Sequence, residues 1–136
     1  MNLYVLDTDH VTLHQHGHPQ VTARIHATFI DQLATTVVTV EEQMRGRLAQ
    51  LGKADNRLPI VYSNLYATSA YFCDLTILPF DSDAQQTFLN LRTQKIRIGT
   101  LELRIATIVL RQNAILVTRN RRDFSQVPEL QIEDWS

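Results

Sequence analysis

The chain has 136 residues, of which 44% are hydrophobic and 20% are charged, and its formal net charge is −1. This composition excludes a disordered chain, and the length predicts one domain over residues 1–136. No apolar run is long enough to span a bilayer, and no secretory signal is recognisable before the first acid, Asp7. The single cysteine, Cys73, excludes an internal disulfide and a Cys-based zinc site, so we expect a cytoplasmic protein.

Predicted strands and helices alternate along the chain. Short apolar or β-branched runs predict strands over residues 3–6, 36–40, 75–80 and 114–118, with a short edge strand over 130–133. Apolar residues at helical spacing predict helices over 21–34, 41–51, 59–72, 82–92 and 100–112. This alternation predicts an α/β fold whose mostly parallel sheet of four to five strands is covered on both faces.

Acidic residues follow three of the predicted strands. Asp7 comes directly after the first strand, Glu41 and Glu42 follow the second, and Asp123 lies five residues beyond Thr118. Sites in parallel α/β sheets form beyond the carboxyl ends of the strands, so these carboxylates are expected to converge. Each acid also has a structural alternative: Asp7 and Asp123 could cap turns or helices, and Glu42 could complete a capping box.

A further acid, Glu102, lies in the first turn of the predicted helix over 100–112, which is otherwise almost entirely apolar. It could simply favour the positive end of the helix dipole. A carboxylate at the start of a buried helix is costly unless a cation meets it, and clustered carboxylates without cysteine select Mg²⁺ or Mn²⁺. Two such ions can hold the attacking and leaving oxygens of a phosphodiester displacement.

The basic residues are unevenly distributed. Eight of the 13 lie between positions 92 and 122, beside a single acid: Arg92, Lys95, Arg97, Arg104, Arg111, Arg119, Arg121 and Arg122. They could form an ordinary solvated helix face, or they could bind phosphate, which the arginine fork holds through two oxygens at once. Together with the converging acids, they suggest a metal-dependent nuclease.

Four motifs resemble those of PIN domains. They are the opening Val5-Leu6-Asp7-Thr8-Asp9; the segment 40–46, in which Glu42 precedes Gly46 by four residues; the segment 98–106 around Glu102; and the segment 116–124, followed by Val127-Pro128. The motifs occur in the family's order and extend over nearly the whole chain. Together they resemble VapC-type toxins, the ribonuclease components of bacterial toxin–antitoxin pairs.

The resemblance implies a PIN-like three-layer α/β/α sandwich and an Mg²⁺- or Mn²⁺-dependent endoribonuclease that cleaves RNA with metal-activated water. It also implies a cognate VapB-type antitoxin and a homodimer. By position, the catalytic, metal-binding acids are Asp7, Glu42, Glu102 and Asp123. Thr118 and Asn120 match polar supporting positions, and the neighbouring Arg119, Arg121 and Arg122 are candidate RNA contacts. The family's third acid is usually aspartate, and Glu102 is longer by one methylene.

Two other functions remain open from the sequence. The longer Glu102 would fit a non-catalytic PIN module that only binds RNA or antitoxin. A receiver-type phosphoacceptor domain would use Asp7, Asp9 and Asp81, but it requires a lysine after its last strand, and no lysine follows Lys95.

Three further features do not enter the proposed chemistry. His14, His16 and His18 could form a metal tract, but Gly17 and Pro19 disturb its geometry, and a surface loop near the rim of the site is expected instead. Cys73 is expected to be a small buried hydrophobe, and Trp135 is expected to be a packing anchor.

Overall fold

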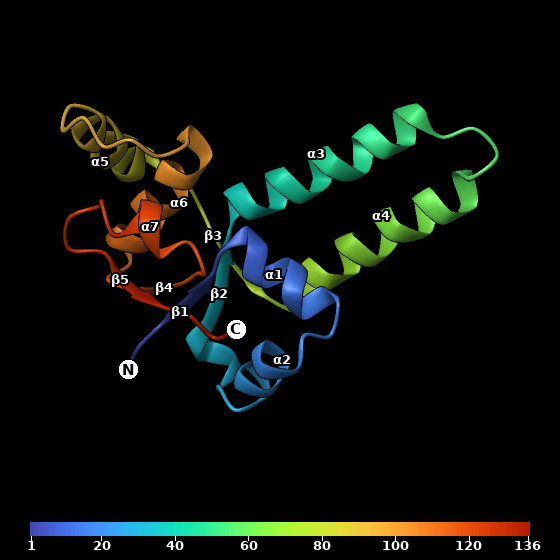
Figure 1. Cartoon of the computed structure of the whole chain (residues 1–136), viewed down its shortest axis with the longest axis horizontal. Helices are drawn as coiled ribbons and strands as arrows, with labels where there is room; N and C mark the ends of the chain where they lie inside the picture. Colours follow the sequence, from blue (N-terminus) through green and yellow to red (C-terminus); the bar gives the residue numbers. More distant parts are fainter.

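The computed structural model describes all 136 residues, which form a five-stranded sheet between two layers of helices (Figure 1). The strands are β1 (Tyr4–Leu6), β2 (Leu33–Thr36), β3 (Thr76–Leu78), β4 (Ile115–Val117) and β5 (Gln131–Glu133). They are ordered β3-β2-β1-β4-β5, and every neighbouring pair is parallel. The predicted α/β fold with a parallel sheet, including the edge strand near the C-terminus, is confirmed.

Seven α-helices connect the strands. They are α1 (Thr8–Gln15), α2 (Pro19–His26), α3 (Val37–Lys53), α4 (Leu58–Cys73), α5 (Ser82–Arg92), α6 (Thr100–Arg111) and α7 (Arg121–Phe124), and a 3-10 turn, η1 (Ile30–Gln32), precedes β2. None of these helices combines the length and the apolar character that crossing a bilayer requires.

Two apolar clusters on opposite faces of the sheet create the three layers. Successive strand residues point to opposite faces, so Val5 packs into one cluster and Leu6 into the other. The cluster of Val5 includes residues of α5 and α6, such as Phe88 and Ile108. The cluster of Leu6 includes residues of α1 and α2, together with the C-terminal Trp135. The predicted three-layer α/β/α sandwich is therefore confirmed, and so is the packing of Trp135, which is 4% exposed.

The order of the strands creates a crevice at one edge of the sheet. The chain moves from β1 to β2 on one side, and later returns to place β4 on the other side of β1. Parallel α/β sheets bind ligands at such a switch point, beyond the carboxyl ends of the strands. The Asp7 N–H donates to the Val117 carbonyl at 3.1 Å, so the ends of β1 and β4 lie side by side there.

The second strand lies earlier in the chain than predicted. The β-branched run from Thr36 to Val40 indicated a strand, but β2 ends at Thr36 and the next four residues form the first turn of α3. Thr36 caps this helix, because its hydroxyl accepts a hydrogen bond from the Thr39 N–H at 3.2 Å. The cap and the burial of both faces of β2 override the local β propensity.

The helix predicted over 21–34 is also corrected. It ends at His26, because Leu33 and Ala34 are needed as buried strand residues, while Phe29 and Ile30 are 75% and 69% exposed. Helices α1 and α7 are absent from the sequence-based predictions. Both are short and polar, and α1 buries only His10 and Val11.

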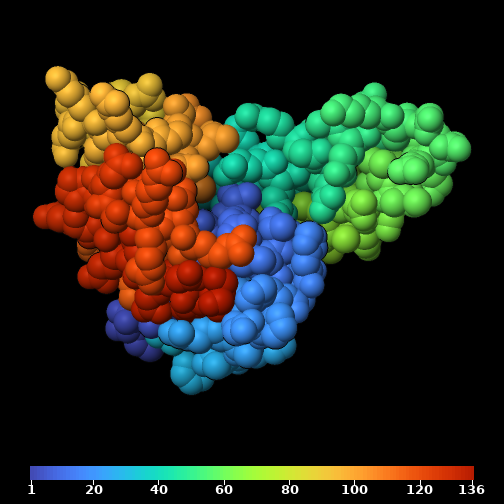
Figure 2. All heavy atoms as spheres, in the orientation of Figure 1, coloured from blue at the N-terminus to red at the C-terminus, as the bar shows by residue number.

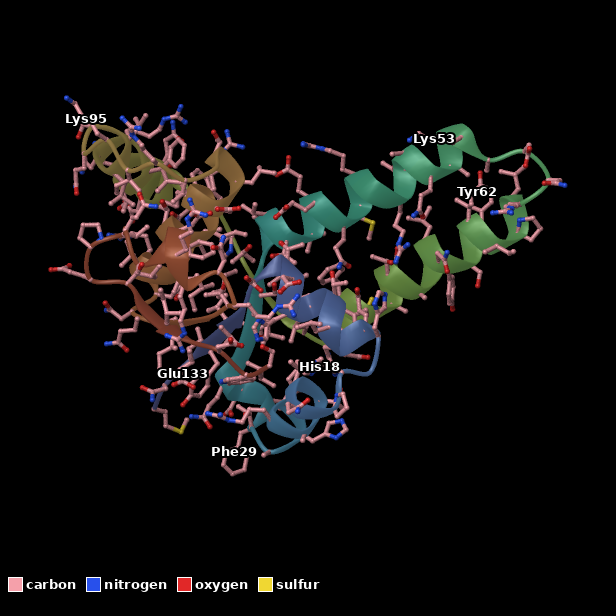
Figure 3. The ribbon with its side chains drawn as sticks, in the orientation of Figure 1. His18, Phe29, Lys53, Tyr62, Lys95 and Glu133 are labelled. Atoms are coloured by element: carbon pink, nitrogen blue, oxygen red, sulfur yellow. The ribbon has the colours of Figure 1, made fainter.

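Helices α3 and α4 form a hairpin that projects from the body of the molecule (Figures 1 and 2). Apolar side chains on α4 are exposed, among them Ile60, Tyr62 and Tyr66 at 63%, 54% and 78%; Figure 3 shows Tyr62 near the outer end of the hairpin. The prediction that Cys73 is buried is wrong. It is exposed because Phe72, its neighbour on the helix, is the residue that turns toward the core.

Candidate functional site

An open cleft of about 490 Å³ lies at the switch point of the sheet. Its walls come from the N-terminal parts of α1, α3 and α6 and from the segment after β4, which are far apart in the sequence. In Figure 2 the blue and teal segments meet beside the base of the α3–α4 hairpin. The lining residues are Asp7, Thr8, Asp9, Thr12, Glu42, Glu102, Ile105, Arg119, Asn120 and Phe124.

Asp7 lies at the carboxyl end of β1 and caps α1. Its Oδ1 accepts a hydrogen bond from the His10 N–H at 2.8 Å, as an N-cap carboxylate does. The capping role considered from the sequence is therefore real, and Asp7 faces the cleft as well. A carboxylate that is only 6% exposed is thus held by the first turn of a helix.

Glu42 reaches the cleft from the second turn of α3. Its Oε1 accepts a hydrogen bond from the Thr8 hydroxyl at 2.7 Å, and that hydroxyl also lies 3.0 Å from Thr39 Oγ1. The capping box with Thr39 does not form, because Thr36 is the N-cap of α3. The adjacent Glu41 is bonded to Arg45 and is not among the cleft residues, so Glu42 is the acid that faces Asp7 and Thr8.

Glu102 lies in the first turn of α6, after the N-cap residue Gly99. Its Oε2 is buried and has no hydrogen-bond partner. Burial raises the pKa of Glu102, and the negative charges of Asp123 and Glu42 raise it further. The structure therefore brings these three acids together around an unsatisfied carboxylate oxygen.

Asp123 is oriented by the segment that follows β4. Asn120 caps α7: its Oδ1 accepts from the Asp123 N–H at 3.3 Å, and its Nδ2 donates to Asp123 Oδ2 at 3.0 Å. The fully buried Thr118 accepts a hydrogen bond from the Asn120 N–H at 2.9 Å. Thr118 and Asn120 thus lie behind the Asp123 carboxylate. The N-cap is Asn120, not Asp123.

The predicted basic surface is divided in the structure. Arg119 lines the cleft and binds Asp9 through two hydrogen bonds, Nε to Oδ2 at 2.6 Å and Nη2 to Oδ1 at 3.0 Å. Arg121 and Arg122 are exposed at the start of α7. The other basic residues lie elsewhere. Arg111, for example, lies at the far end of α6, where it is 3.4 Å from Asp83 of α5.

Two residues of this region were missed by sequence reasoning. Thr8 bonds to Glu42, and His10 lies behind Asp7 with Nδ1 3.3 Å from Asp7 Oδ1. Oxygen and nitrogen atoms of Asp7, Asp9 and His10 lie within 4.8 Å of one another. The only sequence signal for either residue is its place within three positions of Asp7.

The donor set fits a hard divalent cation. The cleft gathers carboxylate oxygens and lacks cysteine, and Mg²⁺ and Mn²⁺ prefer such oxygen ligands. The buried Glu102 Oε2 has no partner within the chain, and a cation would supply one. A cation would also favour the charged form of Glu102, whose pKa is raised in its absence.

The other candidate sites do not assemble. His14 Nδ1 lies 2.7 Å from the Tyr71 hydroxyl, His18 caps α2, and His16 is exposed at the end of α1, so these histidines form no common site. His14 is part of helix α1, not of the expected loop. Asp81, which a receiver domain would need, caps α5 and does not line the cleft.

Comparison with known proteins supports the fold. No protein-family model and no curated protein matches the sequence. Among solved structures, a chain of VapBC from Salmonella typhimurium bound to DNA superposes with a TM-score of 0.83 at 20% identity, over 100% of both chains. A chain of VapBC2 from Rickettsia felis has a TM-score of 0.77 at 24% identity and covers 98% of this chain and 99% of its own.

A third similar structure is VapBC-5 from Mycobacterium tuberculosis, with a TM-score of 0.66 at 25% identity over 98% of both chains. The resemblance that the four sequence motifs indicated is thus confirmed at the level of the fold. The chain has the PIN-like α/β/α fold found in VapBC toxin–antitoxin proteins.

Proposed function

We propose that this protein is a divalent-metal-dependent endoribonuclease and the toxin component of a toxin–antitoxin system in the cytoplasm. The observation that carries the proposal is that Asp7, Glu42 and Glu102 line one cleft while Asp123 lies close to Glu102, whose Oε2 is buried and unpartnered. Carboxylates brought together at such a cost are expected where a cation binds.

The four acids would hold Mg²⁺, or alternatively Mn²⁺, which supplies Lewis-acid activation of water and of the phosphate. Neighbouring polar side chains hold two of these acids in place by hydrogen bonds. Thr8 fixes Glu42 through its hydroxyl, and Asn120 fixes Asp123 through its amide. Arg119 lies at the rim, where its guanidinium can exchange Asp9 for an RNA phosphate.

The proposed partners are RNA, a VapB-type antitoxin and a second copy of the chain in a homodimer. The exposed apolar side chains of α4 support a protein partner, because single soluble chains seldom leave large apolar patches uncovered. The acidic cleft would accept a basic side chain of the antitoxin. Antitoxin and Mg²⁺ are then expected to compete, and inhibition that is insensitive to metal concentration would contradict this.

The test is cleavage of total RNA with Mg²⁺, with Mn²⁺ and with EDTA. We expect cleavage with either metal and none with EDTA. Asp7→Asn should abolish cleavage and keep the fold, because asparagine also caps helices well. The matched control is Asp31→Asn, the same change at an exposed residue of η1, which should cleave normally. An Asp7→Asn protein that cleaves at the wild-type rate would show that the site is wrong.

A second candidate is a non-catalytic module that binds RNA or antitoxin only. The observation that favours it is the length of Glu102, because an extra methylene displaces a carboxylate in a site where about 1 Å of misplacement can cost about 10²-fold in rate. A protein that binds Mn²⁺ and antitoxin but cuts no RNA would support this alternative.

A further inference from the structure

His10 is completely buried, directly behind the cleft. Its ring lies between the Asp7 carboxylate and the C-terminal residues Asp134 and Trp135. We infer that His10 is a positioning residue that sets the orientation of Asp7 and couples it to the docked C-terminus. This inference rests on the proposed function.

The contacts of the ring define its tautomer. The Trp135 backbone N–H donates to His10 Nε2 at 3.3 Å. A ring nitrogen that accepts a hydrogen bond carries no hydrogen, so we place the ring proton on Nδ1. The Asp134 Oδ1 is 3.6 Å from Nε2, which is too long for a competing hydrogen bond.

Nδ1 faces the Asp7 carboxylate. It lies 3.3 Å from Asp7 Oδ1, within ion-pair distance, but it is buried and makes no hydrogen bond with that oxygen or with any other group. The same oxygen accepts the His10 N–H at 2.8 Å. The backbone N–H therefore holds Oδ1 by a hydrogen bond, the adjacent Nδ1 proton attracts the same oxygen electrostatically, and Asp7 Oδ2 is the oxygen without a partner in the chain. Groups behind a metal-binding residue orient it in this way in many metal sites.

His10 is not itself suited to bind the cation. It is not among the cleft residues, its Nε2 lone pair is used by Trp135, and its Nδ1 faces Asp7. We therefore interpret the closeness of His10 to Asp7 and Asp9 as a contact that orients Asp7, not as part of the cation site.

The C-terminus is held by a network of its own. The Trp135 indole N–H donates to Glu133 Oε1 at 3.0 Å, and the Arg24 guanidinium lies 4.9 Å from the centre of the indole ring. Arg24 also bonds to Glu133 at 3.1 Å, and the Tyr4 ring lies 5.2 Å from the indole. Trp135 is thus fixed independently of His10 and can hold the imidazole in place.

Two amide substitutions separate the two nitrogens of His10. In His10→Asn the side-chain amide takes the place of Nδ1 and keeps a donor toward Asp7. In His10→Gln the amide takes the place of Nε2 and keeps an acceptor for the Trp135 N–H. The matched control is His16→Gln, the same change at the exposed C-cap residue at the other end of the same helix.

The first measurement is the affinity of each metal-free protein for Mn²⁺, by calorimetry. We expect His10→Gln to lose about 10-fold and His10→Asn about 2-fold, since partners behind a metal ligand typically contribute about 10–100-fold. His16→Gln should match the wild type. For RNA cleavage, His10→Gln should lower kcat with little change in KM.

The second measurement is the fluorescence of Trp135, the only tryptophan in the chain. The fluorescence should be unchanged in His10→Gln, which would show that the C-terminus remains docked, and shifted in His10→Asn.

Equal losses of Mn²⁺ affinity in both variants would indicate a merely structural role and overturn the inference, as would normal affinity in His10→Gln. If the wild type binds Mn²⁺ but cuts no RNA, only the proposed function is refuted. If the wild type binds no Mn²⁺, both the proposed function and the inference about His10 are overturned.

Discussion

Replacing Glu102 with glutamine should stabilise the metal-free protein while abolishing cleavage. Glu102 Oε2 is buried without a partner, and the carboxylate faces the charge of Asp123. The amide removes the buried charge and can donate a hydrogen bond to Asp123. The same substitution removes a negative charge that we assign to metal binding, so the gain in stability and the loss of activity have one cause.

The size of the expected stabilisation follows from the burial of the Glu102 carboxylate. An unsatisfied buried group costs about 1–3 kcal/mol, and the partial exposure of Glu102 favours the lower half of that range. For a chain of this length each kcal/mol raises Tm by about 3–4 °C, so we expect an increase of about 3–8 °C in EDTA at neutral pH.

The gain should depend on pH in a defined direction. The folded-state pKa of Glu102 lies above the unfolded value of about 4.3. As pH falls through the unfolded-state value of about 4.3, the carboxyl becomes protonated in both states, so the penalty on the wild type disappears and the stabilities of the two proteins should converge. As pH rises through the folded-state pKa, the wild type loses stability relative to Glu102→Gln.

The assay is thermal unfolding from pH 4 to pH 8 in EDTA and in Mg²⁺. Mg²⁺ should raise the Tm of the wild type more than that of the variant, because it binds the folded state. Glu129→Gln, the same change at an exposed residue outside the acidic cleft, is the control and should show no pH-dependent gain. A Glu102→Gln protein that is less stable in EDTA, or that cleaves RNA normally, would refute the reasoning.

Three further variants test the cleft and its surroundings. Thr8→Val removes the hydroxyl that fixes Glu42 and should lower kcat about 10-fold, at unchanged circular dichroism, if placement of this acid matters. Arg121→Ala and Arg122→Ala together should reduce the salt dependence of RNA binding, measured as the slope of log affinity against log salt, by about 0.7 for each lost phosphate contact; an unchanged slope would place the RNA elsewhere. Glu102→Asp should lower metal-dependent cleavage because the shorter side chain no longer reaches, and a rise would instead indicate that the glutamate impairs the site.

The sequence was sufficient to predict the layers of the fold and the convergence of the acids. Strand hydrophobicity is a local property, and Asp7 follows β1 directly, so its place at the sheet edge could be predicted. Glu42 was placed correctly although its preceding strand was not. The run before it forms a helical turn instead, and both arrangements lead the chain to the same edge.

The contacts behind the acids could not be predicted. Trp135 and His10 are 125 residues apart, and their hydrogen bond depends on β5 lying beside β4 and on how the last residues pack. The separation of the basic residues has a similar cause. The spacing of residues along α6 does not show which residue of another helix pairs with Arg111, and in the structure that residue is Asp83 of α5.

The central position of β1 has a consequence for the synthesis of the protein. This strand pairs with β2, about 30 residues later, but its other neighbour, β4, begins only at Ile115. Pairings between such distant segments form late in folding. During translation Asp7, which directly follows β1, can therefore meet Asp123 only after almost the entire chain has been made. A nascent or truncated chain would lack a complete acidic cleft, so the proposed activity would arise only once almost the entire chain has been made.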